Sequence, residues 1–417
     1  MASRDETTED FSSKMADIVM GGYVCLALAL GNRAGLWDIM CTFDEPKTSK
    51  EIADAAGLKP KFVKEWLGAV VAPGIVDLDS SGEKFFLPMH RRNALTEGTP
   101  GATNYTEYAC GLPVLMKDFD QMPTAMKVGG KGITGLSWDD ECPGWAWYQH
   151  LSVDFMQSHM VNGVVPTNKG LREQLEKGIS VLEVGCDVGT ATNVIAENFP
   201  NSNVIGIDIN DEALKKARAD AQLKKLKNVC YDIQDIYNLP SEWSDKFDHV
   251  YTIDTIHGLR PRGSLKGIFR SLKPNGTLNL IELKGNAKMV DNKDLVNAPY
   301  LYMSNLIMNM EDHDHGHGDE DDHSHDQHDH SHDKPDQSHD HGHEEKKSKD
   351  NECEHTESSD IRDDYGQDSE LRPCGDGPGW WWGKDNIFKA VKEAGFKSAE
   401  EHKIPGSYTH VVYVCTK

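Results

Sequence analysis

The sequence contains no pair of cysteines separated by two residues, although nine cysteines are spread along its 417 positions. An odd set of cysteines without such a pair is not typical of a disulfide-stabilised secreted protein. The pattern suits a reducing compartment better, and we therefore expect a cytoplasmic protein.

Positive charge is also scarce. The chain has 44 Lys and Arg side chains against 68 Asp and Glu, which gives a formal net charge of −24 at pH 7. Nucleic-acid binding depends on clustered Lys and Arg side chains that contact phosphates. We therefore expect no nucleic-acid partner.

A hydrophobic run long enough to span a bilayer is absent as well. The longest apolar run, IVMGGYVCLALAL, covers thirteen residues, 18–30, and follows an acidic stretch rather than a basic one. A transmembrane helix needs about 20 apolar residues, and a signal peptide begins with a basic region. We therefore expect no membrane association, and we interpret this run, within the helical apolar spacing of residues 15–40, as a buried helix.

The acidic charge is concentrated in one low-complexity segment. Residues 311–370 contain 23 acidic and 5 basic side chains and so hold −18 of the net charge of −24. A segment with this composition cannot bury enough apolar surface to offset its chain entropy. We expect a disordered, His- and Asp-rich insertion over residues 311–376.

One stretch of this insertion, HDHGHGDEDDHSHDQHDHSHDKPDQSHDHGH at residues 313–343, contains eleven of the nineteen histidines. His-x-His pairs place two imidazoles on one side of an extended chain, and Zn²⁺, Ni²⁺ or Cu²⁺ accept such ligands. The alternative is a solvated loop whose metal affinity is incidental. The candidate ligands are His313, His315, His317, His323, His325, His328, His330, His332, His339, His341 and His343.

Residues 48–87 predict a winged-helix unit. Thr48 or Ser49 can cap a helix that Gly57 ends, and Pro60 can begin a second helix. The following stretch, GIVDLDSSGEKFFL, alternates around a turn and predicts a two-stranded hairpin. Because acidic side chains accompany the lysines of this unit, we interpret it as a protein-contact module rather than a DNA reader.

Residues 178–210, GISVLEVGCDVGTATNVIAENFPNSNVIGIDIN, predict a strand, a glycine-bearing turn, a helix and a second strand that ends at Asp208. An acidic side chain at that place can accept hydrogen bonds from both ribose hydroxyls of a nucleoside. Dinucleotide-binding turns need a second glycine beside the pyrophosphate, and Asp187 stands there instead. Its charge would repel a diphosphate, whereas a phosphate-free cation such as S-adenosylmethionine meets no such repulsion.

The segment VLEVGCDVGT resembles motif I, (D/E)xGxGxG, of the class I S-adenosylmethionine-dependent methyltransferases. Glu183, Gly185 and Gly189 match the motif, and Asp187 replaces its middle glycine. Later segments resemble the family's remaining strands in the family's order, over about residues 171–310 and 377–417. These segments are NVCYDIQDIYNLP, FDHVYTIDTIH, LKGIFRSLKPNGTLNLIEL and YTHVVYVCTK.

The resemblance implies an α/β fold with a Rossmann-like seven-stranded sheet. A winged-helix domain before such a domain is similar to the two-domain small-molecule methyltransferases, including the plant O-methyltransferases, and this likeness implies a homodimer. The expected organisation is a flexible terminus (1–14), a winged-helix dimerisation-type domain (15–100), a helical connector (101–170), a methyltransferase domain in two parts (171–310 and 377–417) and the insertion (311–376) between them.

The same resemblance implies the site residues. In the plant O-methyltransferases a general-base histidine stands at the position of His257, and Asp254 or Glu282 could orient it; the alternative is a strand-end histidine that only bonds backbone. A helical stripe of apolar residues is more typical of core than of a cofactor site, although the family's substrate pocket is built nearby; its members are Tyr300, Tyr302, Met303, Met308 and Met310. The expected contacts with S-adenosylmethionine are Glu183, Gly185, Cys186, Asp187, Gly189, Asp208, Ile209, Asp235 and Ile236.

Two functions are compatible with these features. The first is methyl transfer from S-adenosylmethionine to oxygen or nitrogen of a small molecule, with removal of a proton where the acceptor is a hydroxyl. The second is a catalytically inactive scaffold that buffers metal through its histidines, because Asp187 departs from motif I and Gly258 follows His257 where the plant enzymes have Asp.

Overall fold

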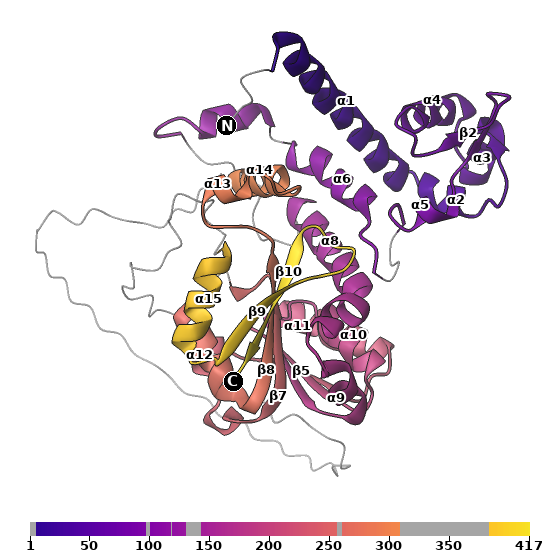
Figure 1. Cartoon of the computed structure of the whole chain (residues 1–417). Helices are drawn as coiled ribbons and strands as arrows, with labels where there is room; N and C mark the ends of the chain where they lie inside the picture. Colours follow the sequence, from indigo (N-terminus) through magenta and orange to yellow (C-terminus); the bar gives the residue numbers. More distant parts are fainter. Residues whose placement is uncertain (1–5, 97–100, 118, 131–142, 257–260, 309–382) are drawn as a thin grey trace, which may run out of the picture.

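The computed structural model describes residues 6–96, 101–117, 119–130, 143–256, 261–308 and 383–417. These residues form a small amino-terminal domain, a helical connector and an α/β domain (Figure 1). His257 and the eleven candidate metal ligands lie outside the described residues. The expected disorder and metal binding of the insertion therefore stay predictions.

The amino-terminal domain has the winged-helix order that the sequence predicts. Thr48 forms a capping box with Glu51, Gly57 ends the helix in the left-handed region, and Pro60 begins the next helix. β3 pairs antiparallel with both β2 and β1, which confirms the hairpin. The elements are α2 (Leu36–Cys41), β1 (Lys47–Thr48), α3 (Ser49–Ala56), α4 (Pro60–Val71), β2 (Asp77–Leu78), β3 (Lys84–Phe86) and α5 (Met89–Arg92).

The prediction of a flexible terminus over residues 1–14 is wrong from Thr8 onward, because α1 (Thr8–Arg33) begins there. Thr7 and Asp10 form a reciprocal capping box at its start. This box satisfies amide groups that have no partner inside the helix, and it allows an ordered first turn despite the polar sequence.

The prediction that the apolar run forms a buried helix is also wrong. In α1 only small residues near the carboxyl end, Ala27, Ala29 and Gly31, are buried, whereas Tyr23 is 66% exposed. The helix packs by this end alone, where a Cβ on Gly31 would lie 2.5 Å from the Trp37 indole nitrogen. By length and composition α1 is a helix that could cross a membrane, with 17% of its most apolar window buried.

The connector consists mainly of two packed helices, α6 (Tyr105–Leu115) and α8 (Pro143–His159). Trp147 of α8 is buried against α6 and donates a hydrogen bond from its indole nitrogen to the Glu107 carbonyl at 2.9 Å. Gly111 is required at this crossing, since a Cβ there would lie 2.3 Å from the Trp147 ring. Between and after these helices lie α7 (Met122–Ala125), a π-helical turn (Met160–Val164) and two 3-10 turns (Phe119–Gln121 and Val165–Thr167).

The α/β domain contains the seven-stranded sheet that the sequence predicts, in the order β6-β5-β4-β7-β8-β10-β9. The five strands from β4 to β8 run parallel, and β10 runs antiparallel to β8 and β9. The strands are β4 (Ser180–Val184), β5 (Asn203–Asp208), β6 (Val229–Ile233), β7 (Phe247–Ile253), β8 (Leu272–Leu283), β9 (Ser398–Lys403) and β10 (His410–Thr416).

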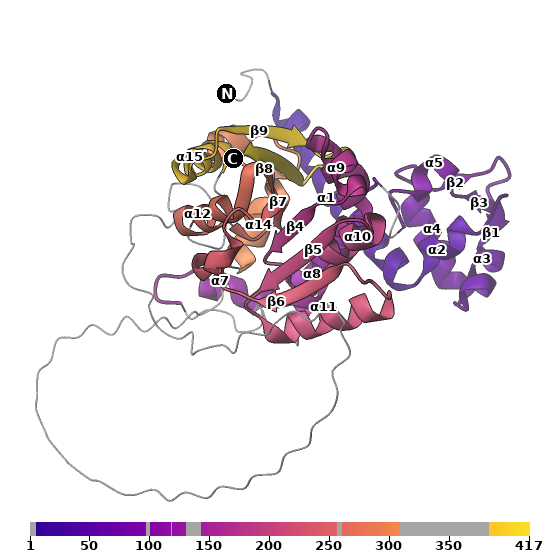
Figure 2. The same ribbon diagram turned by 90° about the horizontal axis from the view of Figure 1, so that it is seen from below.

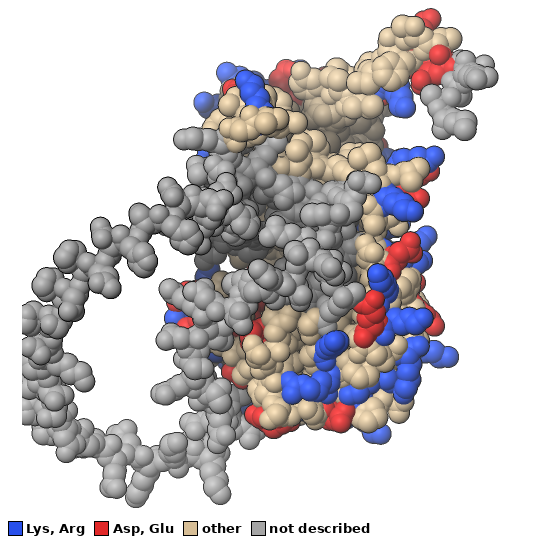
Figure 3. Space-filling view, turned by 90° about the vertical axis from the view of Figure 1, so that its left-hand side faces the viewer, with Lys and Arg blue, Asp and Glu red and all other residues tan. Residues whose placement is uncertain are grey.

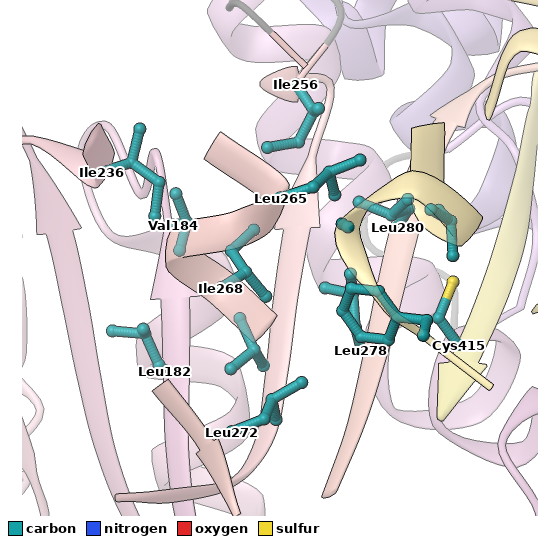
Figure 4. Close-up of a cluster of buried hydrophobic side chains, with 14 of the residues drawn as sticks. Leu182, Val184, Ile236, Ile256, Leu265, Ile268, Leu272, Leu278, Leu280 and Cys415 are labelled. Carbon is teal, nitrogen blue, oxygen red and sulfur yellow. The ribbon is translucent and has the colours of Figure 1, made fainter. Parts of the chain in front are cut away.

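Helices cover both faces of the sheet (Figures 1 and 2). One face packs on α9 (Leu171–Lys177), α10 (Thr190–Asn198) and α11 (Asp211–Leu223), and the other on α12 (Pro261–Ser271) and α15 (Gly383–Ala394). Figure 4 shows side chains such as Leu182 and Leu278 meeting Leu265 and Ile268 of α12. Burial on both faces accounts for the consecutive buried residues in β4 (Val181–Val184) and β8 (Leu278–Glu282).

The carboxyl ends of β7 and β8 meet the helices of the connector. α14 (Ala298–Met308) follows β8 and the short α13 (Met289–Asn292), and it lies with α6 and α8 beyond this edge of the sheet (Figure 1). In open α/β sheets ligands bind outside the carboxyl ends of the strands. This edge is therefore where the candidate site residues should be sought.

Candidate active site

The turn after β4 adopts backbone conformations that restrict its residues. Gly185 and Gly189 have φ of 71° and 73°. A Cβ on Gly185 would lie 2.4 Å from the Thr255 side chain, and one on Gly189 would lie 2.5 Å from the Tyr231 hydroxyl. Asp187, in place of the middle glycine, has φ of 46°, a region that Asp adopts more readily than most residues. The turn therefore keeps a left-handed backbone at all three motif positions.

Asp208 lies at the end of β5, beside this turn. One carboxylate oxygen accepts the Asp187 amide at 3.0 Å and the other accepts the Asn210 amide at 2.9 Å. Each carboxylate oxygen has two lone pairs, so acceptor capacity remains for ribose hydroxyls. The adjacent Ile209 is exposed at the same edge.

Two neighbouring carboxylates, Asp187 and Asp208, make the turn acidic. The Asp187 side chain also accepts a long hydrogen bond, 3.4 Å, from Gln149 of α8. Negative charge at this place opposes a diphosphate and favours a cation. The structure thus brings together the residue types that a sulfonium cofactor requires.

Glu183 lies beneath the turn rather than facing the sheet edge. Its side chain is 1% exposed and accepts hydrogen bonds from the hydroxyl groups of Thr192 and Tyr251, the latter at 3.0 Å. Burial raises the pKa of this carboxyl to about 8, although both hydroxyls lower it. Cys186 is buried as well, and burial raises the pKa of its thiol, so it behaves as a packed, unreactive side chain.

The two predicted cofactor contacts that follow β6, Asp235 and Ile236, lie in different surroundings. Asp235 caps the 3-10 turn Ile236–Asn238, accepting the Tyr237 amide at 2.9 Å, and stays close to the sheet edge. The Ile236 side chain is 5% exposed and points into the core under α12 (Figure 4). The sequence does not predict this orientation, which leaves the Ile236 backbone rather than its side chain at the sheet edge.

A small cavity lies between the sheet edge and the connector. It holds about 20 Å³, roughly the room that one water molecule needs. Its walls come from β7, β8 and β10 on one side and from α6, α8 and α14 on the other. The lining residues are Tyr108, Tyr148, Leu151, Ser152, Phe155, Ile253, Asp254, Leu283, Tyr300 and His410.

Tyr300, which the sequence analysis assigned to the core, lines this cavity with Tyr108 and Tyr148. Burial raises the pKa of all three phenols well above the usual range, and the nearby Asp254 carboxylate contributes in the same direction. The three side chains therefore stay protonated and act as hydrogen-bond donors. A drug-sized molecule fits only if they move, because the cavity is so small.

Two segments of the chain contact both the cavity and the acidic turn. On α8, Gln149 bonds Asp187 while Tyr148 and Ser152 line the cavity. After β7, the Thr255 hydroxyl lies 3.5 Å from the Gly185 carbonyl oxygen, while Asp254 lines the cavity. A cofactor on the turn and a substrate in the cavity would meet at this junction.

Of the two expected catalytic residues that the structure describes, Asp254 lines the cavity and Glu282 does not. The Asp254 carboxylate lies 2.8 Å from Nε2 of His410, a residue that the sequence analysis did not consider. Glu282 lies in β8, buried and paired in register with Val411. The sequence contains a signal for His410, because this histidine is the first residue of the last strand. An antiparallel strand begins at the edge where its parallel neighbours end, so its first residue lies near their carboxyl ends.

Among the described residues no group of three or more His, Cys, Asp and Glu side chains could hold a metal ion.

Comparison with known proteins agrees with these features. Residues 175–341 match the family model of a methyltransferase domain, and residues 22–97 match an Rv2258c-like winged HTH domain. The chain is 32% identical over 109 residues to sterol 24-C-methyltransferase erg6 of Aspergillus fumigatus and 30% identical over 154 residues to the S-adenosyl-L-methionine-dependent Diels-Alderase iccD of Talaromyces variabilis. The matched parts cover 26% and 32% of this chain, and 29% and 52% of the two relatives.

Solved structures with the same fold span the whole chain. Human N-acetylserotonin methyltransferase in complex with SAM has a TM-score of 0.58 at 13% identity, with 100% of this chain and 99% of that chain covered. A methyltransferase in calicheamicin biosynthesis, in its SAH-bound form, has a TM-score of 0.62 at 13% identity, with 98% and 99% covered. At these identities the likeness establishes the fold, and the matched family models identify a winged helix-turn-helix domain at residues 22–97 followed by a methyltransferase domain at residues 175–341.

Proposed function

We propose that this protein transfers the methyl group of S-adenosylmethionine to a hydroxyl group of a small molecule. The observation that carries the proposal is the junction of the acidic turn with an aromatic cavity that contains a carboxylate and an imidazole. The names of the structural neighbours, which refer to N-acetylserotonin and to calicheamicin biosynthesis, support a small-molecule acceptor. The cytoplasmic location expected from the cysteine pattern is part of this proposal.

Calorimetric titration of the full-length protein with S-adenosylhomocysteine tests cofactor binding. We expect one site per chain, and we expect Asp208→Ala to weaken binding by at least about 100-fold, because it removes two hydrogen bonds to a charged group, each worth about 1.5–3 kcal/mol. Asp211→Ala is the matched control, since Asp211 is a nearby carboxylate that pairs with Lys215 on the surface of α11. A folded wild type without detectable binding would contradict the proposal.

A second candidate is a protein that binds the cofactor or a metal ion without transferring a methyl group. Asp187 at the middle motif position and the relative named as a Diels-Alderase favour it. Labelled methyl groups discriminate the two functions: under the second, S-adenosylhomocysteine binds while no labelled product forms from any acceptor tested. The expected base His257 belongs to the first function, and His257→Gln tests it.

For the His-rich insertion we propose binding of Zn²⁺, Ni²⁺ or Cu²⁺ at several labile sites, on the strength of the eleven histidines in residues 313–343. Histidine binds metal as the neutral ring, so affinity should fall below about pH 6.5. Equilibrium dialysis with Zn²⁺, before and after deletion of residues 311–370, measures the contribution of the segment. Equal metal uptake by both proteins would contradict this proposal.

We also propose a homodimer that uses the exposed apolar side of α1. Six large apolar side chains of α1 are each at least 50% exposed in the described chain, namely Phe11, Ile18, Val19, Met20, Tyr23 and Leu30. Figure 3 shows this upper end of the molecule as mostly uncharged surface, with charged side chains gathered below it over the α/β domain. Large apolar patches on soluble proteins mark interaction sites.

A further inference from the structure

The antiparallel last strand brings a histidine to the edge where the parallel strands end. His410 opens β10 and stands opposite Leu283, the last residue of β8. Asp254 directly follows β7, the other neighbour of β8. Because β10 runs against β8, its first residue meets the carboxyl ends of β7 and β8, and His410 lies beside Asp254 although 156 positions separate them.

A continuous chain of hydrogen bonds passes through this histidine. Nε2 of His410 lies 2.8 Å from an Asp254 oxygen, and Nδ1 lies 2.9 Å from the Thr409 hydroxyl. The Thr409 hydroxyl in turn lies 3.0 Å from the Tyr108 hydroxyl. Since a carboxylate only accepts, Nε2 carries the proton in the neutral ring, Nδ1 accepts from Thr409, and Thr409 accepts from Tyr108.

The surroundings hold the ring in place and limit water. His410 is 7% exposed and stacks on Phe155 with ring centroids 4.3 Å apart, and His159 stacks on the same phenyl ring at 5.0 Å. Besides Asp254, the titratable groups around His410 are Glu282 on β8, Tyr108 on α6, Tyr148 and His159 on α8 and Tyr300 on α14. The phenols are held protonated by burial, so none of them serves as the base.

We propose that His410 and Asp254 are the proton-accepting pair for the acceptor hydroxyl, with Thr409 and Tyr108 relaying the proton to the ring. This inference rests on the proposed methyl transfer and deepens it by naming an alternative to His257 as the base. Tyr108 is the member that touches the substrate, whereas Asp254 positions His410 and balances its charge. The sequence led us to expect that Asp254 orients His257, whereas in this proposal Asp254 orients His410.

The step is balanced within the site. The acceptor oxygen attacks the methyl carbon, the carbon–oxygen bond forms, and the carbon–sulfur bond of the sulfonium breaks to give the neutral thioether. The acceptor proton moves to the Tyr108 oxygen, the Tyr108 proton to Thr409, and the Thr409 proton to Nδ1 of His410. The resulting imidazolium is stabilised by the Asp254 carboxylate and later loses its proton to water.

The first experiment needs no substrate. Long-range proton–nitrogen spectra of the full-length protein labelled in histidine report which ring nitrogen is protonated. We expect one histidine signal, lost in His410→Gln, with a proton on Nε2 and none on Nδ1 at neutral pH, and we expect Asp254→Asn to change it. A proton on Nδ1, or an unchanged signal in Asp254→Asn, would overturn the pair.

The second experiment compares oxygen and nitrogen acceptors. The probes are 2-naphthol and 8-hydroxyquinoline beside 2-aminonaphthalene and 8-aminoquinoline, with methyl-labelled S-adenosylmethionine. A neutral amine attacks before it loses a proton, so we expect His410→Gln to lower turnover of a hydroxyl probe by at least about 100-fold and of its amine partner by less than about 10-fold. Thr409→Val and Tyr108→Phe interrupt the relay but keep His410. They test the same proton path if His410→Gln does not fold.

The matched control is His402→Gln. His402 lies in β9, next to β10, and also faces a carboxylate, with Nε2 3.6 Å from Glu400, but outside the cavity. We expect it to behave as the wild type. The pair is overturned if His410→Gln methylates the hydroxyl probes at the wild-type rate, or if His257→Gln causes the loss and His410→Gln does not. A wild type that does not bind S-adenosylhomocysteine removes the proposed function instead, so the two failures are distinguishable.

Discussion

At the scale of single residues, the acidic side chains around the turn after β4 lie in different environments. Asp208 and Asp187 stand at the sheet edge, where their charge favours a cation over a phosphate. Glu183 carries the same functional group but lies under the turn, where burial favours its protonated form. Environment, rather than residue type, thus decides which carboxylate is available to the cofactor.

The raised pKa of Glu183 predicts a pH dependence of stability. Its pKa rises from an ordinary 4.5 to about 8 on folding, so the unfolded chain releases this proton first and stability is lost as the pH rises from about 4.5 through 8. Glu183→Gln keeps an oxygen acceptor and cannot ionise. Its melting temperature should therefore fall less than that of the wild type between pH 5 and 8.5, as measured by calorimetry.

The control for this prediction is Asp235→Asn, a substitution at a carboxyl group on the surface of the same domain. Its melting temperature should follow the wild type across the pH range. Parallel curves for Glu183→Gln and the wild type would show that the Glu183 carboxyl does not couple to folding.

At the scale of elements, two helices begin with the same capping motif but differ in the core against which their first turns pack. Thr48 and Thr7 each form a capping box, at the start of α3 and of α1. Behind α3 lies the core of the winged-helix domain, with Ile52 and Ala53 fully buried. The first turns of α1 contact no buried cluster of the described chain.

Thr48→Ala should therefore destabilise the winged-helix domain by about 1 kcal/mol, the usual cost of removing an N-cap. Thr7→Ala removes the same hydrogen bonds from a turn that frays without opening a core, so its effect on the free energy of unfolding should be smaller. Urea unfolding of the full-length protein, followed by Trp fluorescence, measures both. Equal effects would mean that the amino-terminal half of α1 is packed in solution.

At the scale of the whole molecule, the proposed dimer depends on the exposed residues of α1. Each chain has a mass of 46.4 kDa, and the proposed dimer has twice this mass. The double substitution Ile18→Lys and Tyr23→Lys puts charge on the exposed apolar side of α1 and should give the single-chain mass by light scattering. Leu223→Lys, at the end of α11 and exposed to a similar degree, is the matched control and should remain dimeric.

A wild type with the single-chain mass would contradict the dimer. If that protein also sediments with lipid vesicles, the exposed side of α1 binds a membrane instead, and the expectation of no membrane association is wrong too.

Local features of the sequence by themselves determined much of this protein. Apolar periodicity, the Gly57 and Pro60 helix boundaries and the glycine turn after β4 predict the winged-helix order and the strands of the sheet, because each depends on residues within a few positions of one another. The acidic end of β5 was equally readable, since Asp208 and its turn belong to one βαβ unit.

Only the tertiary structure decided which distant residues meet. The pairing of His410 with Asp254 depends on the antiparallel entry of β10 beside β8, and the exposure of α1 depends on partners that its apolar sequence does not specify. The direction of Ile236 likewise follows from the position of α12. Hydrophobic pattern and turn chemistry act over a few residues, whereas burial and side-chain contacts are set by how the finished elements pack against one another.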